Sequence, residues 1–326
     1  MNIFVTGGAG YIGSATAQAL IDAGHRVTVY DSLVTGHRAA VPREAEFTLG
    51  DLADGAALAE ALGSGKFEAV MHFAAFIEAG ESMQNPGKYF HNNLANSLGL
   101  IEAVHQAGVK HFVLSSTAAI YRASDDPLTE EAVIEPQNTY GQTKLMIEQT
   151  LEWYRRVHGM HLAALRYFNA AGATEARGEA HQPESHLIPL VLRVALGQRE
   201  MVSIFGTDYP TRDGTAVRDY IHIEDLASAH VMTLGALTKT DKLVYNLGNG
   251  KGYSVREVIE AARKVTGHAI PAEDTPRRPG DPARLVASSE RIRKELGWQP
   301  KTPNLEDIIA SAWEWHHAHP DGYVES

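Results

Sequence analysis

A tyrosine and a lysine stand four residues apart at Tyr140 and Lys144, within the segment YGQTK. Residues at this spacing share one face of an α-helix, so the Lys144 ammonium can lie near the Tyr140 phenol. A positive neighbour favours the phenolate form, which makes Tyr140 a candidate general base near neutral pH. In isolation such a pair is more often an ordinary surface pair, so the surrounding sequence has to decide between the two interpretations.

A cluster of hydroxyl side chains supplies the second part of this chemistry. Ser115, Ser116 and Thr117 close a short apolar run that is typical of a buried parallel strand. Side chains at the carboxyl end of such a strand project into the crevice at the sheet edge. A hydroxyl there can bond to the substrate oxygen whose proton Tyr140 removes, and the sequence therefore predicts a hydroxyl–tyrosine–lysine triad.

A glycine-rich turn follows the first apolar run of the chain, at positions 6–13, which read TGGAGYIG. Gly7, Gly10 and Gly13 let the backbone turn tightly and approach a pyrophosphate, while the helix that follows offers unpaired N–H groups. Asp31, at the end of the second apolar run, can accept hydrogen bonds from ribose hydroxyls and disfavours a 2′-phosphate. The pattern predicts NAD rather than NADP, and a structural glycine turn without a nucleotide is the alternative.

Two further segments fit the same dinucleotide site. Gly50-Asp51-Leu52 follows a third predicted strand and can place Asp51 against the adenine amino group, although Asp51 is equally well explained as a loop or cap residue. The small residues of Phe73-Ala74-Ala75 end the fourth strand beside the cofactor. Each segment alone would carry little weight.

The elements that must position these groups alternate along the first half of the chain. Short apolar runs separated by helical patterns predict an α/β protein with a Rossmann-type, doubly wound parallel sheet. The predicted strands are at residues 3–6, 27–30, 69–73, 112–115 and 162–167.

Two long helices are predicted between these strands. One runs from about Asn138 to His158 and stops before Gly159, which is a good C-cap residue. The other covers Lys88–Gln106, where apolar residues every three or four positions predict a single apolar stripe. The members of this stripe are Phe90, Leu94, Leu98, Ile101 and Val104.

Beyond about Gly172 the sequence changes to scattered loops and short strands such as Val202–Phe205. We therefore expect an NAD-binding domain over residues 1–172, to which some later segments return. Residues 173–326 are expected to form mainly a smaller C-terminal α/β lobe that binds the substrate.

Composition limits the partners of the chain. The 326 residues carry a net charge of −11, which disfavours nucleic acid as a partner, and no apolar stretch approaches the ~20 residues of a membrane span. The absence of cysteine and of an export signal in MNIFVTGG predicts a cytoplasmic protein. The 16 histidines are scattered without a metal-binding helix motif, so no metal site is predicted.

Over nearly its whole length the chain resembles the UDP-galactose (UDP-glucose) 4-epimerases, a branch of the extended short-chain dehydrogenases. The resemblance implies redox-neutral epimerisation of UDP-galactose and UDP-glucose at C4, with transient hydride transfer to bound NAD through a 4-keto sugar. It assigns catalysis to Thr117, Tyr140 and Lys144, with Thr117 where many relatives have serine. The matching segments are TGGAGYIGS, YDSLVTGH, HFAAF with GES, SSTAAIY, YGQTK, RYFNAAGA, YPTRDGTAVRDYIHIEDLA and RPGD.

Two binding sites follow from the motifs and the resemblance together. In the family pattern, Asn92 lies near the cofactor amide, Asn169 contacts the diphosphate, and arginines clamp the diphosphate and uridine ribose. The implied cofactor site comprises Gly7, Gly10, Tyr11, Ile12, Asp31, Asp51, Leu52, Phe73, Ala74, Ala75, Asn92, Ser115, Tyr140, Lys144 and Tyr167. The implied UDP-sugar site comprises Thr117, Tyr140, Asn169, His186, Leu187, Arg218, Arg278 and Asp281.

Four positions depart from the family pattern. Ile77 replaces a lysine that reaches the cofactor ribose in some relatives, and Arg122 replaces a glycine without an evident reason. His186 stands where an asparagine often contacts the substrate phosphate, and its ring can supply an N–H donor instead. Leu285 replaces a bulky tyrosine, which implies a roomier sugar pocket that would also admit N-acetylated UDP-hexosamines.

Several alternatives stay open at this point. Dehydratases and decarboxylases of the same fold have acidic residues where this chain has Ala118 and Ala119, which argues against them. A 4-epimerase of another UDP-sugar, such as a pentose or a uronate, and a non-catalytic NAD-binding sensor both remain. The two long helices are expected to form a four-helix homodimer interface, as in the family, and a monomer is also compatible with the sequence.

Overall fold

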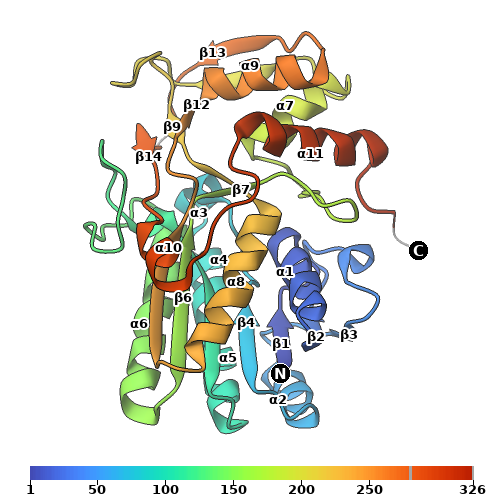
Figure 1. Cartoon of the computed structure of the whole chain (residues 1–326), viewed down its shortest axis with the longest axis vertical. Coiled ribbons are helices and arrows are strands. Elements are labelled where there is room, and N and C mark those ends of the chain that lie inside the picture. Colours follow the sequence, from blue (N-terminus) through green and yellow to red (C-terminus); the bar gives the residue numbers. More distant parts are fainter. Residues whose placement is uncertain (279–280, 325–326) are drawn as a thin grey trace.

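A seven-stranded parallel sheet forms the centre of the computed structural model, which describes residues 1–278 and 281–324 (Figure 1). Pro279 and Gly280 of the RPGD segment lie outside the described residues. The strand order, β11-β6-β5-β4-β1-β2-β3, reverses between β1 and β4 and so confirms the doubly wound prediction. The strands are β1 (Asn2–Thr6), β2 (Arg26–Asp31), β3 (Glu46–Leu49), β4 (Ala69–His72), β5 (His111–Thr117), β6 (His161–Tyr167) and β11 (Lys242–Leu247).

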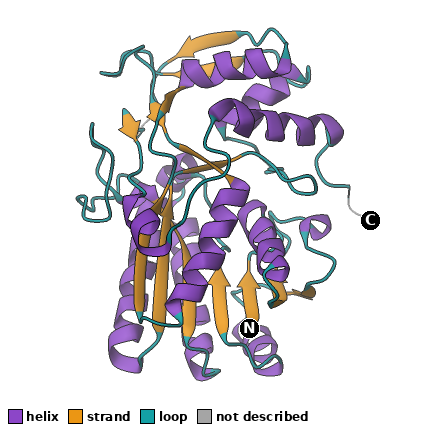
Figure 2. Ribbon diagram, viewed as in Figure 1, coloured by secondary structure: helices purple, strands orange, loops and turns teal. Residues whose placement is uncertain are grey.

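Helices cover both faces of this sheet (Figure 2). On one face α1 (Tyr11–Asp22), α8 (Ile223–Leu237) and α10 (Glu290–Leu296) contribute buried side chains such as Leu20 and Leu226 to a single apolar core. On the other face a second core includes residues of α2 (Gly55–Ser64), α5 (Asn96–Gln106) and α6 (Thr139–His158). Among the described residues, no helix is long and apolar enough to cross a membrane.

The helix predicted at Asn138–His158 is confirmed as α6, and its ends have local causes. The Asn138 side chain accepts a hydrogen bond from the Gly141 N–H at 2.8 Å, which satisfies a free donor of the first turn. Gly159 ends the helix in the left-handed conformation, at φ 68°, where a residue with a Cβ would be strained.

The helix predicted over Lys88–Gln106 is confirmed in extent, but the prediction of a single apolar stripe along it is wrong. The segment consists of α4 (Pro86–Tyr89), a π-helical turn η2 (Phe90–Ala95) and α5. Hydrogen bonds in a π-turn reach one residue further than in an α-helix, so the face that points to the core changes along the segment. Phe90 and Leu98 are consequently exposed, and the polar Asn93 and Ser97 take their places on the buried face.

A smaller lobe lies above the carboxyl edge of the sheet (Figure 1). Its core gathers apolar side chains between Ala171 and Ala312. β11 is a strand of the main sheet, and α8 packs on one face of that sheet. The chain therefore passes between the sheet domain and the lobe more than once. The lobe contains α7 (Leu187–Ala195), α9 (Val255–Thr266), α11 (Leu305–Ala318) and the paired strands β7 (Asn169–Ala171) with β10 (Tyr220–His222), β9 (Val217–Arg218) with β12 (Tyr253–Ser254) and β14 (Arg284–Leu285), and β8 (Val202–Phe205) with β13 (Ala272–Thr275).

A buried ion pair fixes α6 to the sheet. Arg166 on β6 contacts Glu148 on α6 through two hydrogen bonds, Nη2 to Oε2 at 2.6 Å and Nε to Oε1 at 3.0 Å. The Ser116 hydroxyl of β5 also donates to Glu148. Because the bidentate geometry and the extra donor leave the carboxylate well satisfied, this network holds three elements in one register at the end where Tyr140 and Lys144 lie.

Removing one partner of this pair should destabilise the fold strongly. In Arg166→Met, Glu148 stays buried without its counter-charge, and we expect the free energy of unfolding in urea to fall by about 3–5 kcal/mol. The matched control is Arg256→Met, which breaks the exposed Arg256–Asp274 pair (2.8 Å) and should cost about 0–1 kcal/mol. Similar losses in the two variants would contradict a structural role for the buried pair.

Candidate active site

The predicted triad comes together at the carboxyl edge of the sheet. Tyr140 and Lys144 project from the first two turns of α6 toward the end of β5, where the Thr117 hydroxyl hydrogen-bonds to the Tyr140 phenol. The Lys144 Nζ donates to the Ser115 carbonyl at 2.8 Å. Gly141 permits this approach, because a Cβ at that position would lie 2.3 Å from the Ala119 carbonyl oxygen. In the sequence, Gly141 has no distinguishing feature other than its place between Tyr140 and Lys144.

Burial controls the acidity of both side chains. It raises the pKa of Tyr140 to about 12, although the Thr117 hydrogen bond acts in the opposite direction. It lowers the pKa of Lys144 to about 8, because a buried ammonium loses its hydration. The pKa of Tyr140 is therefore raised, not lowered as the sequence predicted, because the loss of hydration outweighs the Thr117 hydrogen bond. Lys144 bonds to a backbone carbonyl and not to the phenol.

The glycine turn packs directly against the end of β4. Gly7 has a φ of +73°, and a Cβ there would lie 2.4 Å from the Ala74 nitrogen. A Cβ at Gly13 would lie 2.2 Å from the Gly7 carbonyl, so the turn closes on itself as tightly as the motif predicts. Gly10 caps α1 without any side-chain hydrogen bond, which leaves the N–H groups around Tyr11 and Ile12 available to an anion.

Two carboxylates lie at the same edge of the sheet. Asp31 ends β2, and its oxygens accept hydrogen bonds from the Ala9 and Leu33 N–H groups, both at 2.9 Å. Each carboxylate oxygen can still accept one further bond, so Asp31 remains able to hold a ribose hydroxyl beside the glycine turn. Asp51 is exposed in the loop after β3, where it accepts from the Ala53 N–H at 2.9 Å.

The segment after β4 is held by Asn93, which is adjacent to Asn92, the residue predicted to lie near the cofactor amide. The Asn93 side chain both accepts from the Phe76 N–H and donates to the Phe76 carbonyl, each at 2.9 Å. Asn92 is the next residue on the π-turn and donates to Asn93 Oδ1 at 3.0 Å. Together Asn92 and Asn93 fix the segment that follows Phe73, Ala74 and Ala75. In the sequence, the only sign of this role is the two adjacent asparagines.

A buried histidine lies beneath the glycine turn, where the strand order reverses. His72 ends β4, and its two ring nitrogens hydrogen-bond to Thr6 Oγ1 at 2.7 Å and to Ser97 Oγ at 2.8 Å. Burial lowers the pKa of His72 to about 3, so the ring is neutral. Nearby, the predicted cofactor residues Ser115 and Tyr167 hydrogen-bond to one another through their hydroxyls.

The lobe brings part of the predicted UDP-sugar site together. Arg218 Nη2 lies 3.2 Å from Asp281 Oδ1, and Asn169 Nδ2 donates to the Asp219 carbonyl at 2.9 Å. The Arg278 guanidinium stacks over the Phe205 ring at 3.9 Å from its centroid. Arg218 and Asp281 are thus in direct contact, and Asn169 bonds to the residue that follows Arg218, whereas the Arg278 side chain packs against β8.

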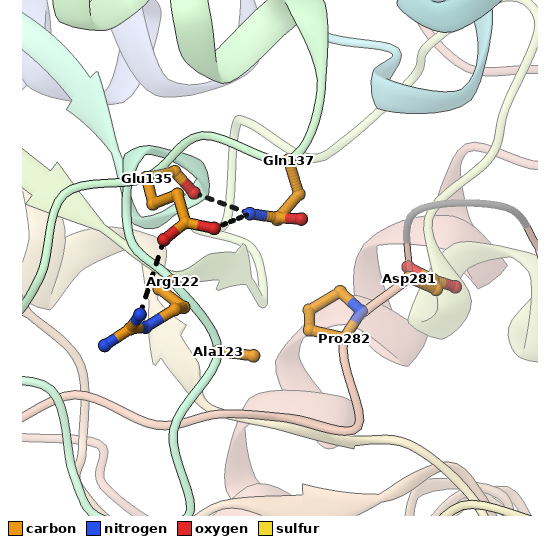
Figure 3. Close-up of a pocket in the computed structure, with 6 residues that line it drawn as sticks. All are labelled: Arg122, Ala123, Glu135, Gln137, Asp281 and Pro282. Carbon is orange, nitrogen blue, oxygen red and sulfur yellow. Dashed lines mark hydrogen bonds and ion pairs between the residues drawn. The ribbon is translucent and has the colours of Figure 1, made fainter.

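Asp281 also lines a pocket of about 310 Å³ (Figure 3). Arg122 and Glu135 form one wall of it and make an exposed ion pair at 3.5 Å, while Asp281 and Pro282 form the opposite wall. The unexplained Arg122 thus lies at the border of the candidate substrate site.

His186 occupies a different environment from the one predicted. It precedes the first residue of α7, Leu187, and its Nδ1 lies 2.7 Å from Glu179 Oε1 and 3.1 Å from Glu184 Oε1. These two carboxylates engage Nδ1, which leaves only Nε2 for the predicted phosphate contact. Glu179, Glu184 and the neighbouring His181 were not among the predicted site residues. Together with His186 they form the eight-residue pattern E-x-H-x-x-E-x-H.

Comparison with protein families gives one match that covers most of the chain. Residues 3–248 match the model of the NAD dependent epimerase/dehydratase family. This range contains the glycine turn, the triad and β11, so it includes all seven strands of the sheet.

Individual relatives match over nearly their whole length. The chain is 49% identical to a UDP-glucose 4-epimerase from Corynebacterium glutamicum over 98% of this chain and 96% of the relative. A solved UDP-glucose 4-epimerase is 50% identical with a TM-score of 0.96, covering 99% of this chain and all of the other. Another, from Bifidobacterium longum in complex with NAD+ and UDP, is 37% identical with a TM-score of 0.95, covering 99% and 100%.

Acidification should weaken the fold through His72. Its folded pKa of about 3 lies below the ordinary 6.5, so the unfolded chain binds the proton more readily. The stability contributed by the neutral ring is full above pH 6.5 and is lost as the pH falls toward 3, by about 2 kcal/mol between pH 6.5 and pH 5.

Urea titrations at several pH values test this expectation. His72→Gln should lose less stability than the wild type over that range, while His268→Gln, in an exposed position, should follow the wild type. If the free energy of unfolding fell equally with pH in the wild type and in His72→Gln, His72 would not be held neutral in the folded protein.

Proposed function

Since the chain belongs to the NAD dependent epimerase/dehydratase family, we propose that it interconverts UDP-galactose and UDP-glucose by inverting the sugar at C4. The observation that carries the proposal is the placement of Tyr140, Thr117 and Lys144 at the same sheet edge as the glycine turn. A proton-transfer group beside a dinucleotide-binding turn is the arrangement that hydride chemistry on a hydroxyl requires.

NAD fits the residues of the cofactor side. The uncapped N-terminus of α1, with Gly7 and Gly10 before it, would hold the pyrophosphate, and Asp31 would hold the adenosine ribose. Bound NAD supplies reversible hydride transfer at the sugar C4, so the overall reaction is redox-neutral. The loop after β4, which Asn93 fixes, borders the same space.

Tyr140 is the group that moves the proton. It accepts the proton of the sugar C4 hydroxyl as the carbonyl forms, and returns it when the alcohol is restored with the opposite configuration. Thr117 donates to the Tyr140 oxygen and so stabilises the phenolate. With a pKa of about 8, Lys144 is largely protonated at pH 7, and its charge also favours the phenolate.

The lobe is proposed to hold UDP while the hexose turns. Arg218, Arg278 and Asn169 offer donors for the diphosphate, and Asp281 can accept from the uridine ribose. Binding the nucleotide rather than the sugar leaves the hexose free to present either face of C4. The cytoplasmic location and the exclusion of nucleic acid remain predictions from composition.

A second candidate function is 4-epimerisation of UDP-N-acetylhexosamines. Leu285 on β14 is only partly buried and packs against the cluster that contains Ala118 and Phe168, next to Thr117. A leucine there leaves more room than a tyrosine for an N-acetyl group. Turnover of UDP-N-acetylgalactosamine beside UDP-galactose would assign both activities, and a protein that binds NAD without converting any UDP-sugar would be the sensor considered above.

Replacing the proton-transfer group should abolish most of the activity. In Tyr140→Phe, conversion of UDP-galactose to UDP-glucose, followed by chromatography, should fall by about 10²–10⁴-fold while NAD remains bound. Tyr154→Phe, on the exposed end of the same helix, is the matched control and should keep the wild-type rate. Near-normal turnover in Tyr140→Phe would remove Tyr140 from the proposed mechanism.

A homodimer is proposed through the packed pair α5 and α6. Apolar side chains on the outer side of this pair are exposed, most of all Trp153 at 63% and Val157 at 64%, with Leu98 at 41%. Large apolar groups gathered on one helical surface are typical of an interface, and two such pairs can form a four-helix bundle.

Charges on this surface should dissociate the dimer. We expect light scattering to give twice the chain mass for the wild type and the single-chain mass for Trp153→Glu/Val157→Glu, because two carboxylates cannot be buried there without partners. Met232→Glu, on the exposed part of α8, should remain dimeric. A monomeric wild type would refute the proposed interface.

A further inference from the structure

Four potential metal ligands lie close together in the loop that enters α7. Glu179, His181, Glu184 and His186 each offer one ligand atom, and these atoms all lie within 4.8 Å of one another. The loop passes between α1 and α11 (Figure 1). In the sequence it comes well after Tyr140 and Lys144. The expectation of no metal site rested on the scatter of the histidines and did not consider this spacing.

The imidazole and carboxylate atoms converge on one point. The Nδ1 atoms of His181 and His186 lie 3.1 Å and 2.7 Å from the same oxygen, Oε1 of Glu179. Glu184 Oε1 lies 3.1 Å from His186 Nδ1 and also accepts the backbone N–H groups of Ser185 and His186. The loop backbone therefore fixes the Glu184 carboxylate in place.

One buried oxygen of this cluster is left without a partner. The Glu184 side chain is fully buried, yet its Oε2 makes no hydrogen bond within residues 1–278 and 281–324. Glu179 is also buried. An unpaired carboxylate oxygen in such a place is costly, because a buried acceptor loses its hydration without replacement, and a cation would supply the missing partner.

We propose that Glu179, His181, Glu184 and His186 form a binding site for a divalent transition metal of the zinc class. Imidazole nitrogens favour zinc and its neighbours over magnesium or calcium, and carboxylates complete such sites. Four ligands around a tetrahedral ion at about 2.0–2.2 Å stand roughly 3.3–3.6 Å apart. The ligand atoms lie between 2.7 Å and 4.8 Å from one another, so some of these separations would have to change by roughly 1 Å when the ion binds. Four protein ligands leave no open position, which indicates a structural site.

The position of the loop shows what such an ion would stabilise. The His181 ring packs edge-on against Tyr11, at 6.4 Å between centroids, and the Tyr11 hydroxyl donates to the Gly172 carbonyl at 2.6 Å. On the same stretch, the Ala180 carbonyl bonds to His37 Nε2 at 3.0 Å. The ion would tie the entrance of the lobe to Tyr11, the first residue of α1.

A network of protonated histidines is the alternative occupant of the same space. The carboxylates raise the pKa of both His181 and His186, and the two histidines hold the pKa of Glu179 below its usual range. Protons can therefore neutralise part of the cluster when no ion is bound. The two states differ in metal content, which can be measured directly.

Metal content of the full-length protein tests the proposal without reference to enzymatic activity. The purified chain is stripped with a chelator, incubated with one equivalent of ZnCl2, passed through a desalting column and analysed by mass spectrometry for metals. Glu184→Gln keeps the acceptor for the loop N–H groups but removes the anionic ligand, and His181→Gln removes a nitrogen ligand. The matched control is His111→Gln/His161→Gln, a histidine pair at the opposite edge of the sheet.

We expect about one zinc per chain in the wild type and in the control, and a loss of at least about tenfold in affinity in Glu184→Gln and His181→Gln. Zn2+, but not Mg2+, should raise the melting temperature of the wild type, and Co2+ should give the intense visible bands of a four-coordinate site. Wild-type protein that retains no metal and shows no shift with Zn2+ would overturn the proposal in favour of the protonated network. Equal zinc in the wild type and both ligand variants would place the metal elsewhere and overturn it too.

Because these measurements do not involve UDP-sugars, they separate the metal site from the proposed function. An inactive protein that binds zinc as expected would leave the inference standing, and an active epimerase without zinc would refute the inference alone.

Discussion

The parallel direction of the seven strands is the constraint on which the candidate site depends. Since every strand ends at the same edge, groups from distant parts of the sequence meet there. They are the glycine turn that follows β1 and the last residues of β2, β5 and β6, which are Asp31, Thr117 and Tyr167. The buried Arg166–Glu148 pair fastens α6 to this edge and so brings Tyr140 and Lys144 against β5. The catalytic chemistry thus rests on the geometry of the sheet rather than on any flexible loop.

The same burial that fixes these groups also sets their charge. Tyr140 is held as a phenol and Lys144 has a lowered pKa, because both lose hydration at the sheet edge. Shifts of this kind by desolvation are typical of functional sites, where a group is made easier to protonate or deprotonate by its neighbours. Here the Thr117 hydrogen bond opposes the effect of burial on the pKa of Tyr140, and a positively charged ligand would add to that opposition.

One of the loops that connect the sheet domain to the lobe has several anchors. Tyr11 and His37 from the NAD-binding side contact Gly172, Ala180 and His181 of this loop, which continues into α7. Its two buried carboxylates and two histidines require either protons or a cation for neutrality.

Features that depend on neighbouring residues could be predicted from the sequence. They are the glycine turn, the strands that alternate with helices, and α6 between its cap residues Asn138 and Gly159. Local periodicity and backbone preference are sufficient for these. Other features follow only from contacts between elements. A π-turn moves Phe90 and Leu98 to the surface, and Asn93 holds Phe76. Lys144 bonds to the Ser115 carbonyl, and the carboxylates of Glu179 and Glu184 contact His186. Each of these contacts depends on which side chains and backbone groups are buried together. Those groups come from elements that are distant in the sequence, so residue spacing does not predict them.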